Sequence, residues 1–384
     1  MEAAIRKFYR DERGNVIVLV GALLALLLVF SVYAIDTSQM LLVRTQLQNA
    51  ADAGALNGAL EFALTGDSAN AIDAAILAAG ANEALIQSGD ANIMGPVTIS
   101  AADIEFPDPG IIRVTTHRTA ATGDNFLNYF MRIFADDGEI GEMTARAAAG
   151  HFWVCGGTCV KPWAPPDRWV DVDGNGLFNA GGADTLDYYD PIATGYTDAD
   201  LGTQVTLVLG NGNKDDFGQF WYYSIDFPPI NKPEFGDPIP GANEYEAWIC
   251  EECHDDRFTV GPGDLVQVEP GKMVGPNSSG LDCLIQRDSL AEWHEPTGKV
   301  INSAFPVSPR IVKAALFDPR EGLKTDLNGR KYLVITKIMV IFIESTAQNN
   351  QQITGRFMRL ADPDGEICED QSNPSFLFKT ALVE

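Results

Sequence analysis

The chain has 384 residues, of which 46% are hydrophobic and 21% charged, and its formal net charge is −26 at pH 7. That length is enough for two domains, and the composition is that of globular protein with one added apolar segment. Nucleic-acid binding needs a cationic surface, so 53 acidic against 27 basic residues argue against nucleic acid as a partner. The acidic excess fits a protein that faces solvent or binds cations.

The first predicted element is a helix that spans a membrane. Val16 to Ile35 contains no charged residue and no proline. At about 1.5 Å per residue this run reaches roughly 30 Å, the thickness of the hydrocarbon core of a bilayer. A lone segment in lipid satisfies its backbone polar groups only as a helix. We therefore expect residues 15–36 to be an uncleaved signal anchor, in contact with inner-membrane lipid, and the helix to continue beyond Asp36.

Basic residues before the span predict its orientation. Residues 1–14 contain Arg6, Lys7, Arg10 and Arg13, and basic flanking residues stay on the cytoplasmic side. We expect residues 1–14 to be a cytoplasmic tail of a single-pass protein in a bacterial inner membrane. The bulk of the chain after Asp36 is then periplasmic or at the cell surface.

Beyond Asp36 the predicted helix carries mostly small residues at three- and four-residue spacing, which places them on one face. They are Leu47, Ala50, Ala51, Gly54, Ala55, Gly58 and Ala59. This face can pack on the protein's own next layer or on a partner helix, including that of a second copy, and both alternatives stay open. Inside the span, Gly21 and Ala25 form a small-xxx-small pair, a pattern of helix contacts in membranes.

Residues 37–150 predict a small α+β module. Asp67 to Leu85 is alanine-rich and predicts a second helix, with Asp67 or Ser68 as its N-cap. Further along we expect two strands and one helix. The strands are Val97–Ile104 and Ile111–Thr119, and the helix is Asp124–Phe134.

Composition changes near residue 150. All six tryptophans lie beyond it, and short apolar runs there alternate with turn residues. Residues 151–384 therefore predict a β-rich, sandwich-like extracytoplasmic domain. Its longest apolar run, KYLVITKIMVIFIEST from Lys331, predicts a central strand. The expected fold class is α+β, with a long N-terminal transmembrane helix that continues into a small pilin-like α+β module, followed by this domain.

Four features of the N-terminal part occur together: a short basic tail that ends at Gly14, one apolar span, Asp36 soon after it, and an alanine-rich helix with Leu47–Gln48 followed by Ala50–Ala51–Asp52–Ala53. With these features the chain resembles the TadG-like (TadE/G-type) proteins of the tight-adherence (Tad, Flp-type) pilus system. The resemblance is close over about the first 65 residues and loose to about residue 150. It implies a structural or assembly component of the bacterial envelope that is linked to pilus assembly or surface attachment. Pilin-like or other Tad-system proteins are the implied partners.

One loop has the spacing of a calcium site. In DVDGNGLFNAGGAD, Asp171, Asp173 and Asn175 occupy the first, third and fifth places of a calcium loop, and Gly176 occupies the sixth. Leu177 would supply its carbonyl oxygen, Asn179 the ninth ligand, and Asp184 the closing ligand in a stretched loop. The alternative is a turn rich in Asp and Asn that binds no metal. A bound calcium ion would be structural.

The cysteines predict disulfide bonds. Cys155, Cys159, Cys250, Cys253, Cys283 and Cys368 all lie beyond residue 150, and their even number fits an oxidising compartment. Only Cys155 with Cys159 is suggested as a pair by closeness in sequence. The run CEECH also matches covalent attachment of haem c, through Cys250 and Cys253 with His254 as axial ligand, and Met273 or His294 as the sixth ligand. A zinc site with His254 is a further alternative.

The sequence offers no signature of an enzyme. It contains no G-x-S-x-G, H-E-x-x-H or P-loop motif, and its four histidines match no catalytic pattern. The expected function is therefore non-catalytic, through helix packing and a displayed β-rich head. The alternatives are an extracytoplasmic c-type haem electron-transfer protein and an extracytoplasmic hydrolase without a known signature.

Overall fold

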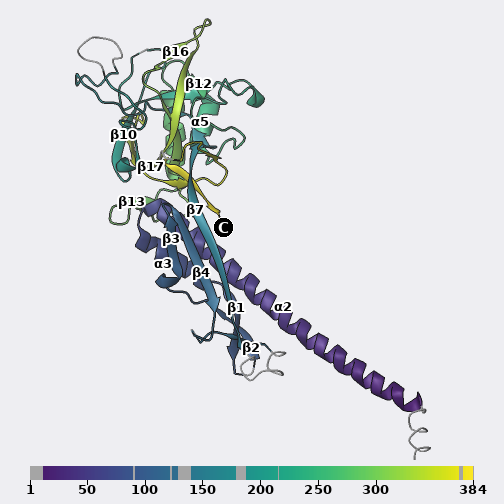
Figure 1. Cartoon of the computed structure of the whole chain (residues 1–384). Coiled ribbons are helices and arrows are strands. Elements are labelled where there is room, and N and C mark those ends of the chain that lie inside the picture. Colours follow the sequence, from purple (N-terminus) through teal and green to yellow (C-terminus); the bar gives the residue numbers. More distant parts are fainter. Residues whose placement is uncertain are drawn as a thin grey trace, which may run out of the picture. The chain divides into compact units, whose positions relative to one another are not determined.

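The computed structural model describes residues 12–89, 91–121, 123–128, 140–178, 187–214, 216–371 and 375–383. It has a long apolar N-terminal helix followed by a β-rich region with several sheets, and so confirms the α+β class (Figure 1). The chain divides into two compact units. Unit 1 comprises Met1–Gly150 and Ala381–Glu384, and unit 2 comprises His151–Thr380. The return of the chain to unit 1 after Thr380 was not predicted from the sequence.

Unit 1 is built on helix α2, Glu12–Thr65, which has 54 residues and passes Asp36 without a break. Figure 1 shows its N-terminal half projecting from the rest of unit 1. Helix α3, Ser68–Gly80, follows after a short turn, and the Asp67 side chain accepts a hydrogen bond from the Ala69 amide as its N-cap. The predicted second helix thus begins where expected but ends five residues before Leu85, because that residue belongs to a strand.

The strands of unit 1 form a hairpin, a larger sheet and one short pair. They are β1 (Glu83–Ser88) with β2 (Ala91–Pro96), then β3 (Ile104–Asp108), β4 (Ile111–Arg118) and β7 (Met143–Gly156), and β5 (Phe126–Leu127) with β6 (Ile140–Gly141), with the 3₁₀ turn η1 (Ala101–Asp103) before β3. The predicted strand at residues 111–119 is confirmed, whereas residues 97–103 lie between strands. The helix expected from Asp124 is wrong at Phe126 and Leu127, which are in a strand, and residues 129–134 of it lie outside the described residues.

The core of unit 1 is formed by α2 and α3 together with β4, β7 and neighbouring strand residues. Alternate residues of β4 are buried, as in a strand with one face on a core. Among them Ile112 and Val114 contact the same buried cluster as Leu47 and Ala51 of α2. The buried Thr116 hydroxyl donates to the Leu47 carbonyl at 2.9 Å, which joins the strand to the helix.

Unit 2 contains a mixed sheet of nine strands. In order they are β12 (Leu265–Val268), β11 (Trp221–Asp226), β10 (Gln204–Leu209), β18 (Gln352–Phe357), β17 (Lys331–Ala347), β15 (Ile311–Phe317) and β8 (Val160–Lys161), with β16 (Lys324–Thr325) on β17 and β9 (Trp163–Ala164) on β11. The run from Lys331 is the central strand β17, as predicted. Because β12 also pairs with β17, the first five strands form a closed ring of pairings, which removes two exposed sheet edges.

Two helices of unit 2 were not predicted. They are α5 (Ala242–Cys250) and α6 (Val274–Arg287), which lie side by side. The first turn of α6 contains Gly275 and Pro276, poor signals for a helix; its buried Leu281 and Leu284 and the disulfide at Cys283 hold it in place.

The remaining elements of unit 2 are short. They are the hairpin β13 (Glu292–His294) with β14 (Lys299–Ile301), the strands β19 (Leu360–Ala361), β20 (Glu366–Ile367) and β21 (Leu377–Leu382), and the turns η2 (Asp198–Asp200) and η3 (Pro233–Phe235). Strand β20 pairs with the C-terminal end of β7. Strands β7 and β21 each begin in one unit and end in the other.

Candidate functional site

The N-terminal half of α2 exposes a continuous apolar surface. Every described side chain from Val16 to Ser31 is exposed, and an 18-residue window here has a mean hydropathy of 2.9 with no buried residue. In a soluble protein, a core helix of this length would bury these apolar residues. Within the described residues α2 is the one helix long and apolar enough to cross a membrane, and it therefore suggests a membrane anchor.

The C-terminal half of α2 is buried on its small-residue face. Leu47, Ala51 and Ala55 are fully buried in unit 1. A Cβ atom added to Gly58 would lie 2.6 Å from Cδ1 of Ile112, and one added to Gly54 would lie 3.2 Å from the carbonyl oxygen of Ala75 in α3. Of the two alternatives for this face, the structure thus places it on the protein's own layer, against α3 and β4.

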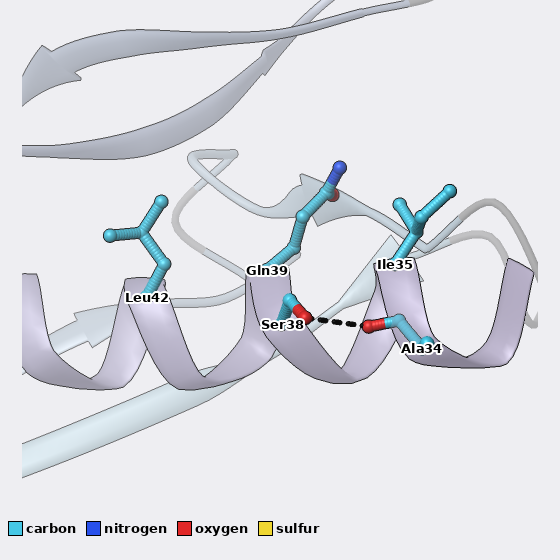
Figure 2. Close-up of a pocket in the computed structure, with 5 residues that line it drawn as sticks. All are labelled: Ala34, Ile35, Ser38, Gln39 and Leu42. Carbon is cyan, nitrogen blue, oxygen red and sulfur yellow. Dashed lines mark hydrogen bonds between the residues drawn. The ribbon is translucent and has the colours of Figure 1, made fainter. Parts of the chain in front are cut away.

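The small pair within the span has no such neighbour among the described residues of unit 1. Gly21 and Ala25 are exposed, and an added Cβ at Gly21 would meet nothing within 4 Å. Where α2 reaches the rest of unit 1, Figure 2 shows Ile35, Gln39 and Leu42 directed to one side of the helix, along a shallow hollow. Ala34 and Ser38 also line this hollow, and the Ser38 hydroxyl donates to the Ala34 carbonyl at 2.7 Å.

Residues 14–61 match the family model described as Flp pilus-assembly TadE/G-like. This N-terminal segment is TadE/G-like. The matched residues cover the apolar span of α2 and nearly all of its packed half, from Gly14 past Gly58. No curated protein and no solved structure matches the chain.

The TadE/G-like match supports a component of the Tad pilus system, and it rests on residues 14–61. Its motif residues occupy distinct environments in unit 1. Asp36 is 4% exposed although its neighbours on α2 are largely open, and Gln48 donates to the Asp52 carboxylate at 2.9 Å and to the Arg146 carbonyl at 2.8 Å. The bond from Gln48 to Arg146 thus ties α2 to strand β7 of unit 1.

The acidic loop of unit 2 folds into consecutive turns. The two oxygens of Asp171 accept hydrogen bonds from the amides of Gly174 and Gly176, both at 2.8 Å. Asp173 accepts from the Asn175 amide at 3.0 Å, and Asn175 accepts from the Leu177 amide at 2.6 Å. These turns bring Asp171 and Asp173 together; the predicted ligands Asn179 and Asp184 lie outside the described residues.

A third carboxylate completes this cluster. Ligand oxygens of Asp171, Asp173 and Asp187 lie within 4.8 Å of one another, and three carboxylates at that separation are a donor set that suits a calcium ion. Asp187 is buried and accepts a hydrogen bond from the Val172 amide at 2.9 Å. The pairing of Val170 with Tyr188 places Asp187 beside the acidic loop. Its spacing from the loop gave no sequence signal, so it was not predicted.

All six cysteines form disulfides within unit 2, which confirms the general prediction but not the suggested pair. The bonds are Cys155–Cys368, Cys159–Cys253 and Cys250–Cys283. The pairing of Cys155 with Cys159 is wrong because both point to partners that are distant in sequence. Thioether links to haem, and thiolate ligation of zinc, require Cys250 and Cys253 to be free, whereas each is joined to another cysteine.

His254 is held by carboxylates. Its Nδ1 lies 2.7 Å from Glu251 and its Nε2 2.8 Å from Glu244. Burial lowers the pKa of His254, but these two hydrogen bonds outweigh it and raise the pKa above the ordinary value. Both ring nitrogens are thus engaged, which leaves neither for haem or zinc, while His294 lies in the hairpin β13–β14 with Nδ1 2.8 Å from the Thr297 hydroxyl.

Unit 2 buries two ionisable groups outside these sites. Asp226 is 4% exposed, and burial together with the hydrogen bond that its protonated carboxyl donates to the neighbouring Glu269 raises its pKa to about 8. Lys161 is 3% exposed and donates to the carbonyl oxygens of Trp248 and Glu251, and burial lowers its pKa to about 7. Both groups are far from their ordinary titration ranges, which makes the stability of unit 2 dependent on pH.

Proposed function

We propose that this TadE/G-like chain is a non-catalytic, single-pass structural or assembly component of a Tad-type pilus. Helix α2 anchors it in the inner membrane. Unit 2 is a disulfide-bonded head domain that lies outside the cytoplasm, where it contacts pilus proteins or serves in adhesion. The observation that carries the proposal is the continuity of α2, whose exposed apolar half runs without a break into a half that forms the core of unit 1.

The chain is proposed to contact its partners through helix packing. The buried face of α2 is already occupied by α3 and β4, so contacts with pilin-like helices or a second copy fall to the exposed face of the span, with Gly21 and Ala25. Small residues let two backbones approach closely in lipid, where van der Waals contact drives association. The four basic residues before the span favour an orientation with the N-terminus in the cytoplasm.

The head is proposed to be a rigid display surface. Three disulfides close loops across unit 2, and its sheet contains a closed ring of pairings. Calcium bound by Asp171, Asp173 and Asp187 would stiffen the loop beside the Val170–Tyr188 pairing. The chemistry that such an ion supplies is structural, since it neutralises three adjacent carboxylates.

The test uses the native bacterium. Deletion of the gene is expected to abolish Tad pili and surface attachment, and full-length protein should restore both. Protease added to spheroplasts should cleave unit 2, and chemical cross-linking should join the full chain to identified Tad pilins. Normal pili in the deletion strain, or a protease-resistant unit 2 with reduced cysteines, would contradict the proposal.

A further inference from the structure

The chain contains four Asn–Gly peptides, and the structure describes all of them. They are Asn57–Gly58, Asn175–Gly176, Asn211–Gly212 and Asn328–Gly329. An Asn–Gly peptide can modify itself, because the backbone nitrogen that follows the asparagine can attack the carbonyl carbon of its side-chain amide. Glycine favours this attack since it has no Cβ atom to crowd the approach. The surroundings of each peptide decide which of the four reacts in the folded chain.

Three of the four glycine amides are held by backbone carbonyl groups. Gly58 lies within helix α2, where its amide belongs to the hydrogen-bond ladder of the helix. The buried Gly212 donates to the Gly271 carbonyl at 2.9 Å. Gly329 donates to the backbone carbonyl of Asp326 at 3.1 Å. A carbonyl oxygen accepts a hydrogen bond but does not take up the proton, so these contacts keep each nitrogen in its unreactive form.

Asn175–Gly176 is the one of the four whose glycine amide donates to a carboxylate. Gly176 donates to Oδ2 of Asp171 at 2.8 Å, which places a proton acceptor on the nitrogen that must lose its proton. The side-chain carbonyl that this nitrogen attacks is polarised, because Oδ1 of Asn175 accepts a hydrogen bond from the Leu177 amide at 2.6 Å. The same hydrogen bond stabilises the negative charge that develops on Oδ1 during the attack.

The orientation of the side-chain amide and the space around it also favour the reaction. Nδ2 of Asn175 donates to Oδ2 of Asp173 at 2.7 Å, which holds the amide in one orientation. Residues 172–176 are exposed, and a Cβ atom added to Gly176 would meet nothing within 4 Å. The loop therefore has room for the succinimide ring that forms, and water can reach it.

We propose that Asn175 is a site of self-modification, at which the folded chain converts the side-chain amide into a carboxyl group. The Gly176 nitrogen passes its proton to Asp171 and forms a bond to Cγ of Asn175. The bond between Cγ and Nδ2 breaks, and Nδ2 leaves as ammonia with the proton that Asp171 held. One water molecule then opens the succinimide, which gives aspartate or isoaspartate at position 175.

The modification changes the charge of the acidic loop after the protein has folded. Aspartate at position 175 adds a carboxylate beside Asp171 and Asp173, and the charge of the ligands is one of the features that set the calcium affinity of such loops. Isoaspartate instead routes the backbone through the former side chain and lengthens it by one carbon atom, which disrupts the consecutive turns. The reaction itself requires no bound cation.

The test follows all four asparagines in one sample of the full chain. Detergent-solubilised protein is incubated at neutral pH with EDTA, and its peptides are analysed by mass spectrometry at successive times. Each modified asparagine gains about 1 Da, the difference between an amide and a carboxyl group. Asn328 is the matched control, because its Asn–Gly peptide is also exposed in a turn. We expect Asn175 to be modified at least about tenfold faster than Asn328, a modest share of what a positioned base contributes.

The variant Asp171→Asn removes the proton acceptor and should slow the modification of Asn175 to the rate of Asn328, which itself should not change. In urea with the disulfides reduced, the four asparagines of the natural chain should react at similar rates, because the preference comes from the fold. Equal rates at Asn175 and Asn328 in the folded chain would overturn the proposal, and so would an unaltered rate at Asn175 in folded Asp171→Asn. A preference for Asn175 that persists in urea would also overturn it, and this measurement remains decisive where the variant fails to fold.

Discussion

The guanidinium of Arg118, fully buried in unit 1, lies 3.1 Å from the carboxylate of Asp124. It also donates to backbone carbonyl groups at the base of the hairpin β1–β2. These are the carbonyls of Ala84, Leu85, Gly95 and Pro96. An isolated two-stranded hairpin is marginally stable at best, so one side chain at the end of β4 holds both strands in place.

Replacement of Arg118 should release the hairpin. Arg118→Met leaves a buried carboxylate and several carbonyls without their donor, and loss of one partner of a buried ion pair costs about 3–5 kcal/mol. We expect the amides of β1 and β2 to exchange hydrogen much faster in the full chain while those of α3 change little. Arg113→Met is the matched control, since its ion pair with Glu105 reaches solvent, with side-chain exposures of 30% and 67%. Unchanged exchange in β1 and β2 would contradict this role.

Gly58 tests the close approach of α2 to β4. Gly58→Ala places a Cβ 2.6 Å from Cδ1 of Ile112, and overpacking of this kind costs about 1–3 kcal/mol. Alanine favours a helix over glycine by about 1 kcal/mol, so a tight interface is needed for net destabilisation. We expect a lower unfolding midpoint for unit 1, measured by circular dichroism in detergent. Gly21→Ala, with open space around it, should not lower the midpoint, and a rise for Gly58→Ala would show that the interface can relax.

The sequence predicted the elements whose signal is local. The apolar run from Val16, the cap at Asp67 and the central strand from Lys331 each depend on residues close together in the chain, and each was found. The pairing of Cys155 with Cys368 spans 213 residues, and no local pattern carries that information. Helix α6 was missed for a related reason, since its first turn reads as a loop and long-range burial of Leu281 decides its state.

The candidate calcium site likewise contains residues that a local pattern predicts and one that it does not. Asp171 and Asp173 follow a loop pattern and lie together, whereas Asp187 reaches them through the pairing of Val170 with Tyr188. The small face of α2 could be found from its spacing. Which surface covers it depended on how α3 and β4 pack, which the spacing does not determine.

Asp226 should make unit 2 less stable as the pH rises. Its pKa is about 8 in the folded chain against an ordinary 3.8, so between these values the folded state holds a proton that the unfolded state has lost. Stability therefore falls as the pH rises through this window and levels off above it. Asp226→Asn should remove the fall in urea-unfolding midpoints of unit 2, while the exposed Asp256→Asn should keep it. If the stability of unit 2 still falls with pH in Asp226→Asn, another group is responsible for the fall.

Lys161 should make unit 2 more stable as the pH rises, which is the opposite of the effect of Asp226. Its pKa is about 7 when folded against 10.5 ordinarily, so between these values the unfolded state binds the extra proton and stability rises with pH. We expect Lys161→Met to abolish the rise above pH 7 in the same unfolding series. The exposed Lys272→Met is the control and should retain it. An unaltered rise in Lys161→Met would mean that this amine stays charged in the fold.

Calcium should stabilise unit 2 through the acidic loop. A ligand at one hundred times its Kd raises stability by about 2.7 kcal/mol when it binds only the folded state. We expect added calcium to raise the thermal midpoint of the full chain, and Asp171→Asn and Asp187→Asn each to abolish the shift. Asp364→Asn, an exposed carboxylate elsewhere in unit 2, should leave it unchanged. A calcium shift of the same size in all three variants would exclude the loop as the binding site.

Both passages of the chain between the two units lie inside strands, β7 and β21. Unit 2 is therefore joined to unit 1 at both of its ends, and the disulfide bond between Cys155 and Cys368 links the chain near those two ends. A single nick in any loop between these two cysteines would leave every fragment attached. Under the proposed display of unit 2 outside the cytoplasm, a pulling load on this unit would be divided between the two strands.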